Sequence, residues 1–153
     1  MNSQFYVAES KEVPGEKGCF SGRAWKKGEV LERILIEDVL RNIMHVDEFM
    51  PLSEHESSRY CYRFSGDLLH FSSKDRLVTD YINHSNFPNV LIYMGCTMAM
   101  RDIMPGEEIL ADYRFLMHER FEMDCGSYSV RGLPAAEADR EFLRMCAEIS
   151  ASS

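Results

Sequence analysis

Short stretches in which apolar and polar side chains alternate run through the first two thirds of the chain, a pattern typical of β-strands. Tyr60, Tyr62 and Phe64 alternate with Cys61 and Arg63, which predicts a strand with one aromatic face. Turn residues separate further apolar stretches, which predict strands at residues 5–7, 29–36, 68–71, 89–93 and 97–103. The last two form a predicted hairpin that turns near Gly95. The pattern therefore indicates a mostly β fold.

Two segments have helical character instead. Residues 37–58 are polar and partly helical in pattern, and we expect an inserted helix and loop between sheet segments there. From Pro134 the chain reads as a helix with proline in its first turn. The spacing i, i+3, i+4, i+7 defines one apolar stripe of Phe142, Met145, Cys146 and Ile149. We expect this stripe to pack on the domain, which makes the fold class mostly β with added helix (β+α).

The composition is that of one globular domain. The chain has 153 residues, of which 45% are hydrophobic and 27% charged. Its best apolar run, residues 91–100, is broken by Gly95 and is too short to span a membrane. The amino terminus lacks the basic start and apolar core of a signal peptide. We therefore expect an intracellular protein, in nucleus or cytoplasm, with no membrane partner.

Five cysteines, an odd number without a Cys-x-x-Cys pair, indicate neither a disulfide framework nor a complete zinc site. They favour a reducing compartment. The net charge of −8 argues against direct nucleic-acid binding, because phosphate contacts need clustered Lys and Arg. An acidic surface suits a basic peptide partner, although it also serves solubility alone.

Two polar segments carry the candidate chemistry. Residues 83–89 read Asn-His-Ser-Asn-Phe-Pro-Asn, and residues 106–113 read Gly-Glu-Glu-Ile-Leu-Ala-Asp-Tyr. Taken alone, an Asn-His turn is usually a local hydrogen-bonding device, and Tyr113 is a core aromatic residue. Together, in this order and at this separation, they resemble the two signature motifs of the SET domain, the fold of most protein lysine methyltransferases.

Two upstream segments strengthen the resemblance. Residues 15–20 read Gly-Glu-Lys-Gly-Cys-Phe and are similar to the opening run of the family. Family members more often have Gly-x-Gly there, and in this chain Glu16 stands at the first glycine position. Residues 62–64, Tyr-Arg-Phe, look like the family's Tyr-x-Phe strand. The resemblance spans about residues 5–115.

The resemblance implies a fold and a division of the chain. The fold would comprise several small sheets, a pseudoknot in which the two signature segments pass through one another, and a C-terminal helix. Residues 5–115 would form the SET domain. Residues 116–153 would form a degenerate post-SET segment and a helix packing on the domain.

The resemblance also implies a cofactor, S-adenosyl-L-methionine, and a methyl transfer to the side-chain amine of lysine in a protein or peptide, with a histone tail as one candidate substrate. Tyr113 would be the catalytic residue. The implied cofactor contacts are Glu16, Lys17, Gly18, Tyr62, Asn83, His84 and Tyr113. Two other interpretations remain open: a catalytically silent SET-like module that binds a basic tail, and an unrelated acidic β-rich interaction domain.

The segment after Tyr113 departs from the family pattern. Many members carry Cys-x-Cys-Gly-x-x-x-Cys-Arg-Gly, which completes a zinc site. Here residues 123–132 read Met-Asp-Cys-Gly-Ser-Tyr-Ser-Val-Arg-Gly, with Met123 and Val130 at two cysteine positions. One thiolate cannot satisfy four-coordinate zinc, so no metal is expected. The helix after Pro134 is then the candidate to close the side of the site that the zinc segment closes in other members. Phe121 or Tyr128 is the candidate to stack on the adenine of the cofactor.

The number of methyl groups depends on space near the substrate amine. Many family members have an aromatic residue two positions before the catalytic tyrosine, which limits the product. This chain has Ala111 there. A small residue leaves room for a dimethyl or trimethyl product, unless Phe115 or Tyr93 fills the space.

Overall fold

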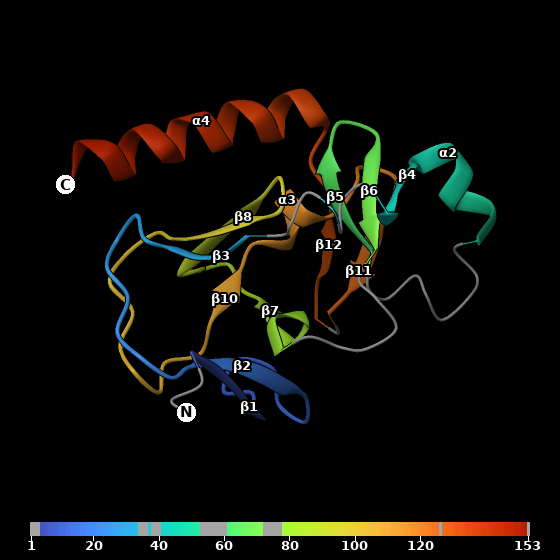
Figure 1. The fold of residues 1–153 in the computed structure, drawn as a ribbon. Coiled ribbons are helices and arrows are strands. Elements are labelled where there is room, and N and C mark those ends of the chain that lie inside the picture. Colours follow the sequence, from blue (N-terminus) through green and yellow to red (C-terminus); the bar gives the residue numbers. More distant parts are fainter. Residues whose placement is uncertain are drawn as a thin grey trace.

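The computed structural model describes residues 4–33, 37, 41–52, 61–71, 78–125 and 127–152. Within these ranges the fold is mostly β, with four small sheets and a long C-terminal helix (Figure 1). This is the predicted fold class. The first residue of the predicted strand at 60–64, and residues 34–36 of the one at 29–36, lie outside the described residues.

The largest sheet has the strand order β3-β9-β8-β10-β7. Its strands are β3 (Val30–Arg33), β7 (Asn83–His84), β8 (Val90–Tyr93), β9 (Cys96–Ala99) and β10 (Leu110–Ala111). The β8–β9 hairpin is the predicted one, and its turn has positive φ at Met94 (50°) and Gly95 (73°), as a tight two-residue hairpin requires. The second strand is shorter than predicted. It ends at Ala99, and Ile103 forms an isolated bridge with Trp25.

Strand β10 lies between β7 and β8 and runs parallel to both. The Ser85 N–H donates to the Ala111 carbonyl at 3.0 Å, and the Asn89 N–H donates to the Leu110 carbonyl at 3.0 Å. The loop from β7 to β8 is therefore hydrogen-bonded along β10. This places the two signature segments side by side and agrees with the predicted crossing.

Smaller elements surround this sheet. An antiparallel pair joins β1 (Phe5–Glu9) and β2 (Lys17–Ser21), and a hairpin joins β11 (Glu122–Asp124) and β12 (Ser129–Arg131). A third sheet has the order β4-β6-β5, with strands β4 (Ile43–His45), β5 (Cys61–Ser65) and β6 (Leu68–Phe71). The short helical elements are α2 (Val46–Phe49), η1 (Met50–Leu52), η3 (Val78–Tyr81) and α3 (Tyr113–Leu116).

The predicted helix and loop at residues 37–58 lies in part outside the described residues, which here are 37 and 41–52. Its described part contains the strand β4, which was not predicted, followed by α2 and η1. The predicted strand with an aromatic face is β5, and Tyr62 and Phe64 are both half-buried in it. The most buried side chain of β5 is Arg63, at 4% exposure.

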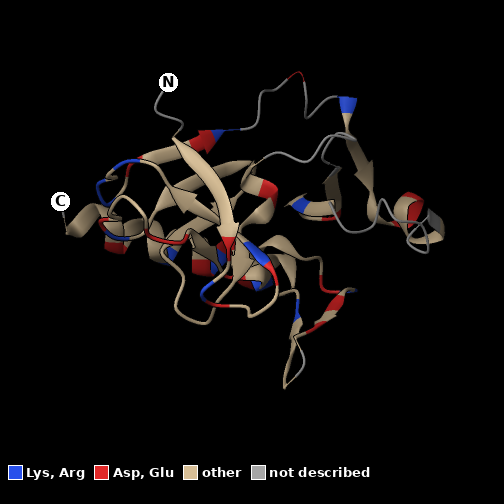
Figure 2. Ribbon diagram, turned by 90° about the horizontal axis from the view of Figure 1, so that it is seen from below, with Lys and Arg blue, Asp and Glu red and all other residues tan. Residues whose placement is uncertain are grey.

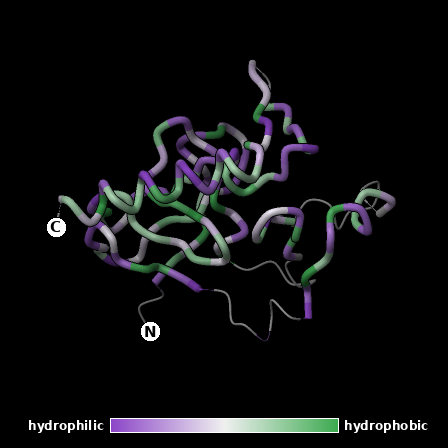
Figure 3. The backbone as a smooth tube through the Cα atoms, turned by 90° about the horizontal axis from the view of Figure 1, so that it is seen from above, coloured by the Kyte–Doolittle hydropathy of each residue, from purple (hydrophilic) through white to green (hydrophobic). Residues whose placement is uncertain are grey.

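Helix α4 (Ala135–Ala151) runs along one side of the molecule (Figure 1). Hydrophobic and hydrophilic residues alternate along the helix (Figure 3). The predicted stripe faces inward, because Met145 is buried and the ring of Phe142 stacks on that of Tyr93, with 4.4 Å between the ring centroids. Burying a Met or Phe side chain contributes about 1.5–3 kcal/mol, so the stripe accounts for the docking of α4. Pro134 stands at the N-cap, one position before the predicted first turn.

Charged residues of both signs are interspersed on the face shown in Figure 2. Among the described residues, no helix combines the length and apolar character needed to cross a membrane.

Candidate active site

The site forms where β10 ends and α3 begins. Asp112 is the N-cap of α3, and its carboxylate accepts a hydrogen bond from the Arg114 N–H at 3.0 Å. The next residue, Tyr113, donates from its hydroxyl to the Ile82 carbonyl at 2.6 Å. The Tyr113 N–H donates to Nδ1 of His84 at 3.1 Å, and the two rings are 5.5 Å apart. The two signature segments therefore meet at Tyr113.

Burial favours the neutral form of His84. Its ring is buried, at 5% exposure, and burial lowers the pKa of the imidazole, although the Asp112 carboxylate and the nearby Asn86 side chain oppose this. Because Nδ1 accepts the Tyr113 N–H, the proton of the neutral ring is on Nε2. Within the described part of the chain, this Nε2 is a buried polar atom without a hydrogen-bond partner. A ligand acceptor could satisfy it.

Tyr128 is the aromatic residue that reaches this site. The β11–β12 hairpin brings its ring to 6.1 Å from the ring of His84, and 45% of the residue remains exposed. Phe121, the other candidate, packs edge-on against Phe49 at 5.6 Å and lies 6.2 Å from His118.

The β11–β12 hairpin is held by ordinary β contacts. Met123 and Val130, at the positions of two family cysteines, are direct cross-strand partners, and Val130 is buried. The Cys125 N–H donates to the Tyr128 carbonyl at 2.9 Å. The described residues contain no group of three or more His, Cys, Asp or Glu side chains that could hold a metal.

The buried residues of helix α4, the candidate to close this side of the site, belong to a different cluster from the one that Tyr113 contacts. Ala138 and Met145 cluster with Leu91, Tyr93 and Phe115. Tyr113 packs against the other large cluster, which contains Ile82 and Ala111. Of the elements that follow Tyr113 in the chain, the β11–β12 hairpin lies beside His84, because its Tyr128 ring contacts the His84 ring.

The three residues expected from the opening run lie in or just before β2. Asn83 Nδ2 donates to the Lys17 carbonyl at 3.0 Å, so this edge contacts the first signature segment. Gly18 packs so closely that an added Cβ would lie 2.3 Å from Glu108 Oε1. The Glu16 carbonyl accepts from the Ser10 N–H at 2.9 Å, while its side chain is exposed.

Tyr62 comes from a different sheet. Its hydroxyl donates to Asp80 Oδ1 at 3.1 Å, and Asp80 precedes Ile82 by two residues. Tyr62 also packs against the cluster that contacts Tyr113. The structure thus brings Lys17, Gly18, Asn83, His84 and Tyr113 into one contact network and connects Tyr62 to it through η3.

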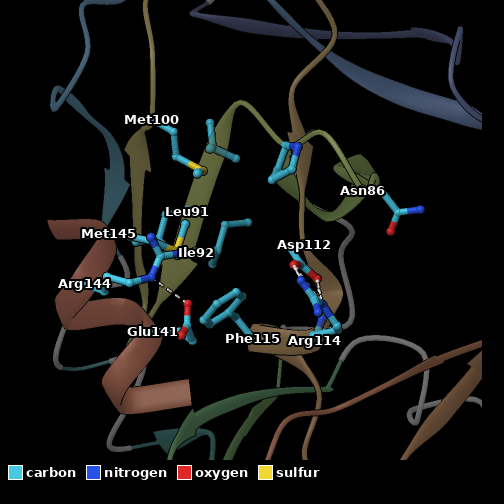
Figure 4. A pocket seen from close by; sticks show the side chains of 12 residues that line it. Asn86, Leu91, Ile92, Met100, Asp112, Arg114, Phe115, Glu141, Arg144 and Met145 are labelled. Atoms are coloured by element: carbon cyan, nitrogen blue, oxygen red, sulfur yellow. Dashed lines mark hydrogen bonds and ion pairs between the residues drawn. The ribbon is translucent and has the colours of Figure 1, made fainter. Parts of the chain in front are cut away.

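A separate groove of about 180 Å³ lies between the loop after His84 and α4 (Figure 4). Leu91, Phe115 and Met145 are among its apolar residues, and two ion pairs, Asp112–Arg114 and Arg144–Glu141, stand at its sides. The described residues that line it include neither Tyr113 nor His84. It is also smaller than the roughly 300 Å³ at which small-molecule sites begin.

Sequence patterns did not single out two structurally important residues. Arg63 donates to the carbonyls of Phe115, Arg114 and Leu133, and it thereby ties β5 to the segment after Tyr113. Glu108 is the second acid of the Gly-Glu-Glu string and is buried at 5% exposure. A charged residue inside an otherwise apolar stretch is the signal that could have marked Arg63.

The comparison with curated proteins found no match to this chain. The family model of the SET domain matches residues 16–114, which is 99 of the 153 residues and contains all of the segments that meet at Tyr113. With this match and the interleaved strands, the chain belongs to the SET domain family.

Proposed function

We propose that this protein transfers a methyl group from S-adenosyl-L-methionine to the side-chain amine of a lysine in a protein substrate. SET domain proteins are in general protein lysine methyltransferases. The observation that carries the proposal is the pair of hydrogen bonds made by Tyr113, from its hydroxyl to Ile82 and from its N–H to His84. The candidate substrates in this proposal include a histone tail.

The residues at the site fit the cofactor. The buried Nε2 of His84 can donate to a ligand, and the exposed ring of Tyr128 can stack on an aromatic base. The main chain of Lys17 and Gly18 forms the opposing edge, with Asn83 beside it. In this proposal Glu16, Lys17, Gly18, Tyr62, Asn83, His84 and Tyr113 hold the cofactor, and Tyr128 is added to the set.

When bound, S-adenosyl-L-methionine supplies a methyl group activated by a sulfonium. Tyr113 acts by orientation and electrostatics. Its proton is directed at the Ile82 carbonyl, and in this proposal the phenol oxygen accepts weak C–H···O contacts from the methyl group. Each such contact contributes about 0.5–1 kcal/mol. Alignment of the reacting groups supplies much of the remaining rate acceleration.

The substrate lysine must be neutral to attack. With a pKa of about 10.4, only about one lysine in 2,500 is neutral at pH 7. An apolar surrounding lowers that pKa, and the proton can leave to water before the attack. His84 does not serve as the base through Nδ1, because that lone pair already accepts the Tyr113 N–H. We assign His84 to cofactor binding.

We also propose residues 5–115 as the SET domain and residues 116–153 as the degenerate post-SET segment with its helix. The test of the function is incubation with methyl-labelled S-adenosyl-L-methionine and a mixture of histones and lysine-rich peptides, followed by mapping of the label. We expect label on lysine. Cofactor binding without transfer to any substrate would favour the silent module that binds a basic tail.

A further inference from the structure

The carboxylate of Glu108 is buried, yet it accepts hydrogen bonds from a loop near the start of the chain. Ser10 Oγ donates to Oε1 at 2.6 Å. The N–H groups of Lys11 and Glu12 donate to Oε2 at 2.7 and 3.2 Å. A buried carboxylate needs such donors to offset its lost hydration, and here one loop, residues 10–13, supplies most of them.

The same carboxylate contacts two residues of the proposed cofactor site, Asn83 and Gly18. Asn83 Nδ2 lies 3.3 Å from Oε1. On the other side the carboxylate lies against Gly18, where an added Cβ would be 2.3 Å from Oε1 and 2.9 Å from Cδ. Glu108 therefore joins loop 10–13, β2 and the first signature segment.

A second contact closes the loop against the site. Ser85 Oγ donates to Glu12 Oε1 at 2.8 Å, and Ser85 directly follows His84. Within the loop, Ser10 Oγ also accepts from the Val13 N–H at 2.9 Å. The loop conformation is thus organised around Ser10 and Glu108.

We propose that Glu108 is a positioning residue that holds loop 10–13 and the Lys17–Gly18 edge of β2 in the arrangement that receives the cofactor. It acts through Gly18 and Asn83. The cofactor part of this inference rests on the proposed function. The other part, that Glu108 holds loop 10–13 in place (the loop clamp), does not rest on the proposed function, because it concerns contacts within the free protein.

The first test is amide hydrogen exchange of the full chain without ligand. We expect the Lys11 and Glu12 amides to be protected in the wild type and to exchange at least about tenfold faster in Glu108→Gln, since the new NH₂ group faces donors instead of accepting from them. Glu107→Gln is the matched control. That neighbouring carboxylate accepts from the Met104 N–H and pairs with Arg101, so the two loop amides should keep their protection.

Ser10→Ala gives a second variant that leaves Glu108 in place. It removes one donor to Glu108 and the bonds that Ser10 Oγ accepts from the Glu12 and Val13 N–H groups. The Lys11 amide, which does not contact Ser10 Oγ, should again exchange faster. Melting temperatures of all variants verify that they fold. Unchanged exchange in both folded variants, or unprotected amides in the wild type, would overturn the clamp.

The second test measures S-adenosyl-L-methionine binding and steady-state turnover. For Glu108→Gln we expect the Kd and KM for the cofactor to rise about tenfold, with kcat at saturation changed by less than about threefold. Glu107→Gln should match the wild type within about twofold. If the wild type and a folded Glu108→Gln variant bind the cofactor with the same affinity, the inference is overturned. A wild type that binds no cofactor would instead overturn the proposed function, and the exchange data would still decide the clamp.

Discussion

The hydroxyl of Tyr113 donates a 2.6 Å hydrogen bond to the main-chain carbonyl of Ile82. Strand pairing sets this relationship, because Leu110 lies opposite Asn83 and Ala111 opposite His84 in the parallel β10–β7 pair. The phenol is therefore positioned by the crossing of two segments far apart in the chain, and its orientation does not depend on a flexible loop.

Tyr113→Phe removes this hydroxyl and leaves the ring in place. We expect turnover to fall by about 10²-fold, because an oriented polar group at the reacting atoms is lost. Cofactor affinity should change little. Stability should fall by about 1 kcal/mol, since one hydrogen bond to the Ile82 carbonyl is lost. Single-turnover methyl transfer, cofactor titration and urea unfolding measure the three quantities. Turnover equal to the wild type would remove Tyr113 from its catalytic role.

Tyr128→Ala tests the adenine contact. Because the ring stands beside His84 and is partly exposed, its loss should weaken S-adenosyl-L-methionine binding by roughly tenfold while changing stability by less than about 1 kcal/mol. Tyr128→Phe should retain most of the affinity. Phe121→Ala is the comparison: it removes a ring packed on Phe49, so it should lower stability and spare affinity. The reverse pattern, measured by calorimetry, would exchange the roles of the two aromatics.

Local sequence could predict the elements whose signals are themselves local. The β8–β9 hairpin follows from apolar strands around Gly95, and α4 follows from a 3.6-residue stripe that begins after Pro134. The approach of Tyr113 to His84 was inferred only from a resemblance to a family, since the two residues are far apart in the chain. Hydrophobic periodicity and secondary-structure propensity alone cannot specify such a crossing of distant segments.

Burial of charge was the part that the sequence could not reveal. Glu107 and Glu108 are adjacent and chemically identical, yet one pairs with Arg101 and the other is buried under loop 10–13. Which acid points inward depends on the isolated bridge between Glu108 and Phe20 of β2, a tertiary contact. The role of Arg63 could not be predicted for a similar reason, because its carbonyl acceptors lie 51 to 70 residues further along the chain.

The pH dependence of His84 follows from its burial. Its pKa in the folded protein is below the ordinary 6.5, so below pH 6.5 the unfolded state binds more protons than the folded state. The contribution of neutral His84 to stability is therefore complete above pH 6.5 and is lost as pH falls through the folded pKa. Protonation of Nδ1 also removes the acceptor of the Tyr113 N–H. NMR titration of the His84 ring should give a midpoint below 6.5, and His84→Asn should remove this part of the pH dependence. A midpoint at or above 6.5 would contradict the assignment.

The product should carry more than one methyl group. Ala111 is small and fully buried, and Phe115 and Tyr93, which could have filled the space near the amine, belong to the cluster that packs under α4. Mass spectrometry of a peptide after long incubation with excess cofactor should show dimethyl or trimethyl lysine. Monomethyl lysine alone, with cofactor still present and the enzyme still active, would count against this prediction.

Arg63→Met should destabilise the fold more than any exposed charge substitution. The guanidinium is buried, which lowers its pKa, and it donates to three carbonyls around the end of α3 and the start of α4. Methionine keeps much of the volume but removes the guanidinium donor from all three carbonyls, of which that of Arg114 keeps the Leu133 N–H. The unfolding free energy should therefore fall by about 2–4 kcal/mol.

Arg63→Lys separates charge from geometry. Lysine keeps the positive charge, but its single ammonium cannot reproduce the planar fork that reaches Phe115, Arg114 and Leu133 together. It should therefore recover only part of the loss. Arg131→Met, which removes an exposed arginine paired with Glu122, should cost less than about 1 kcal/mol. Urea unfolding of the three variants gives the comparison, and equal costs for Arg63→Met and Arg131→Met would mean that the buried guanidinium does not hold α3 and α4 to β5.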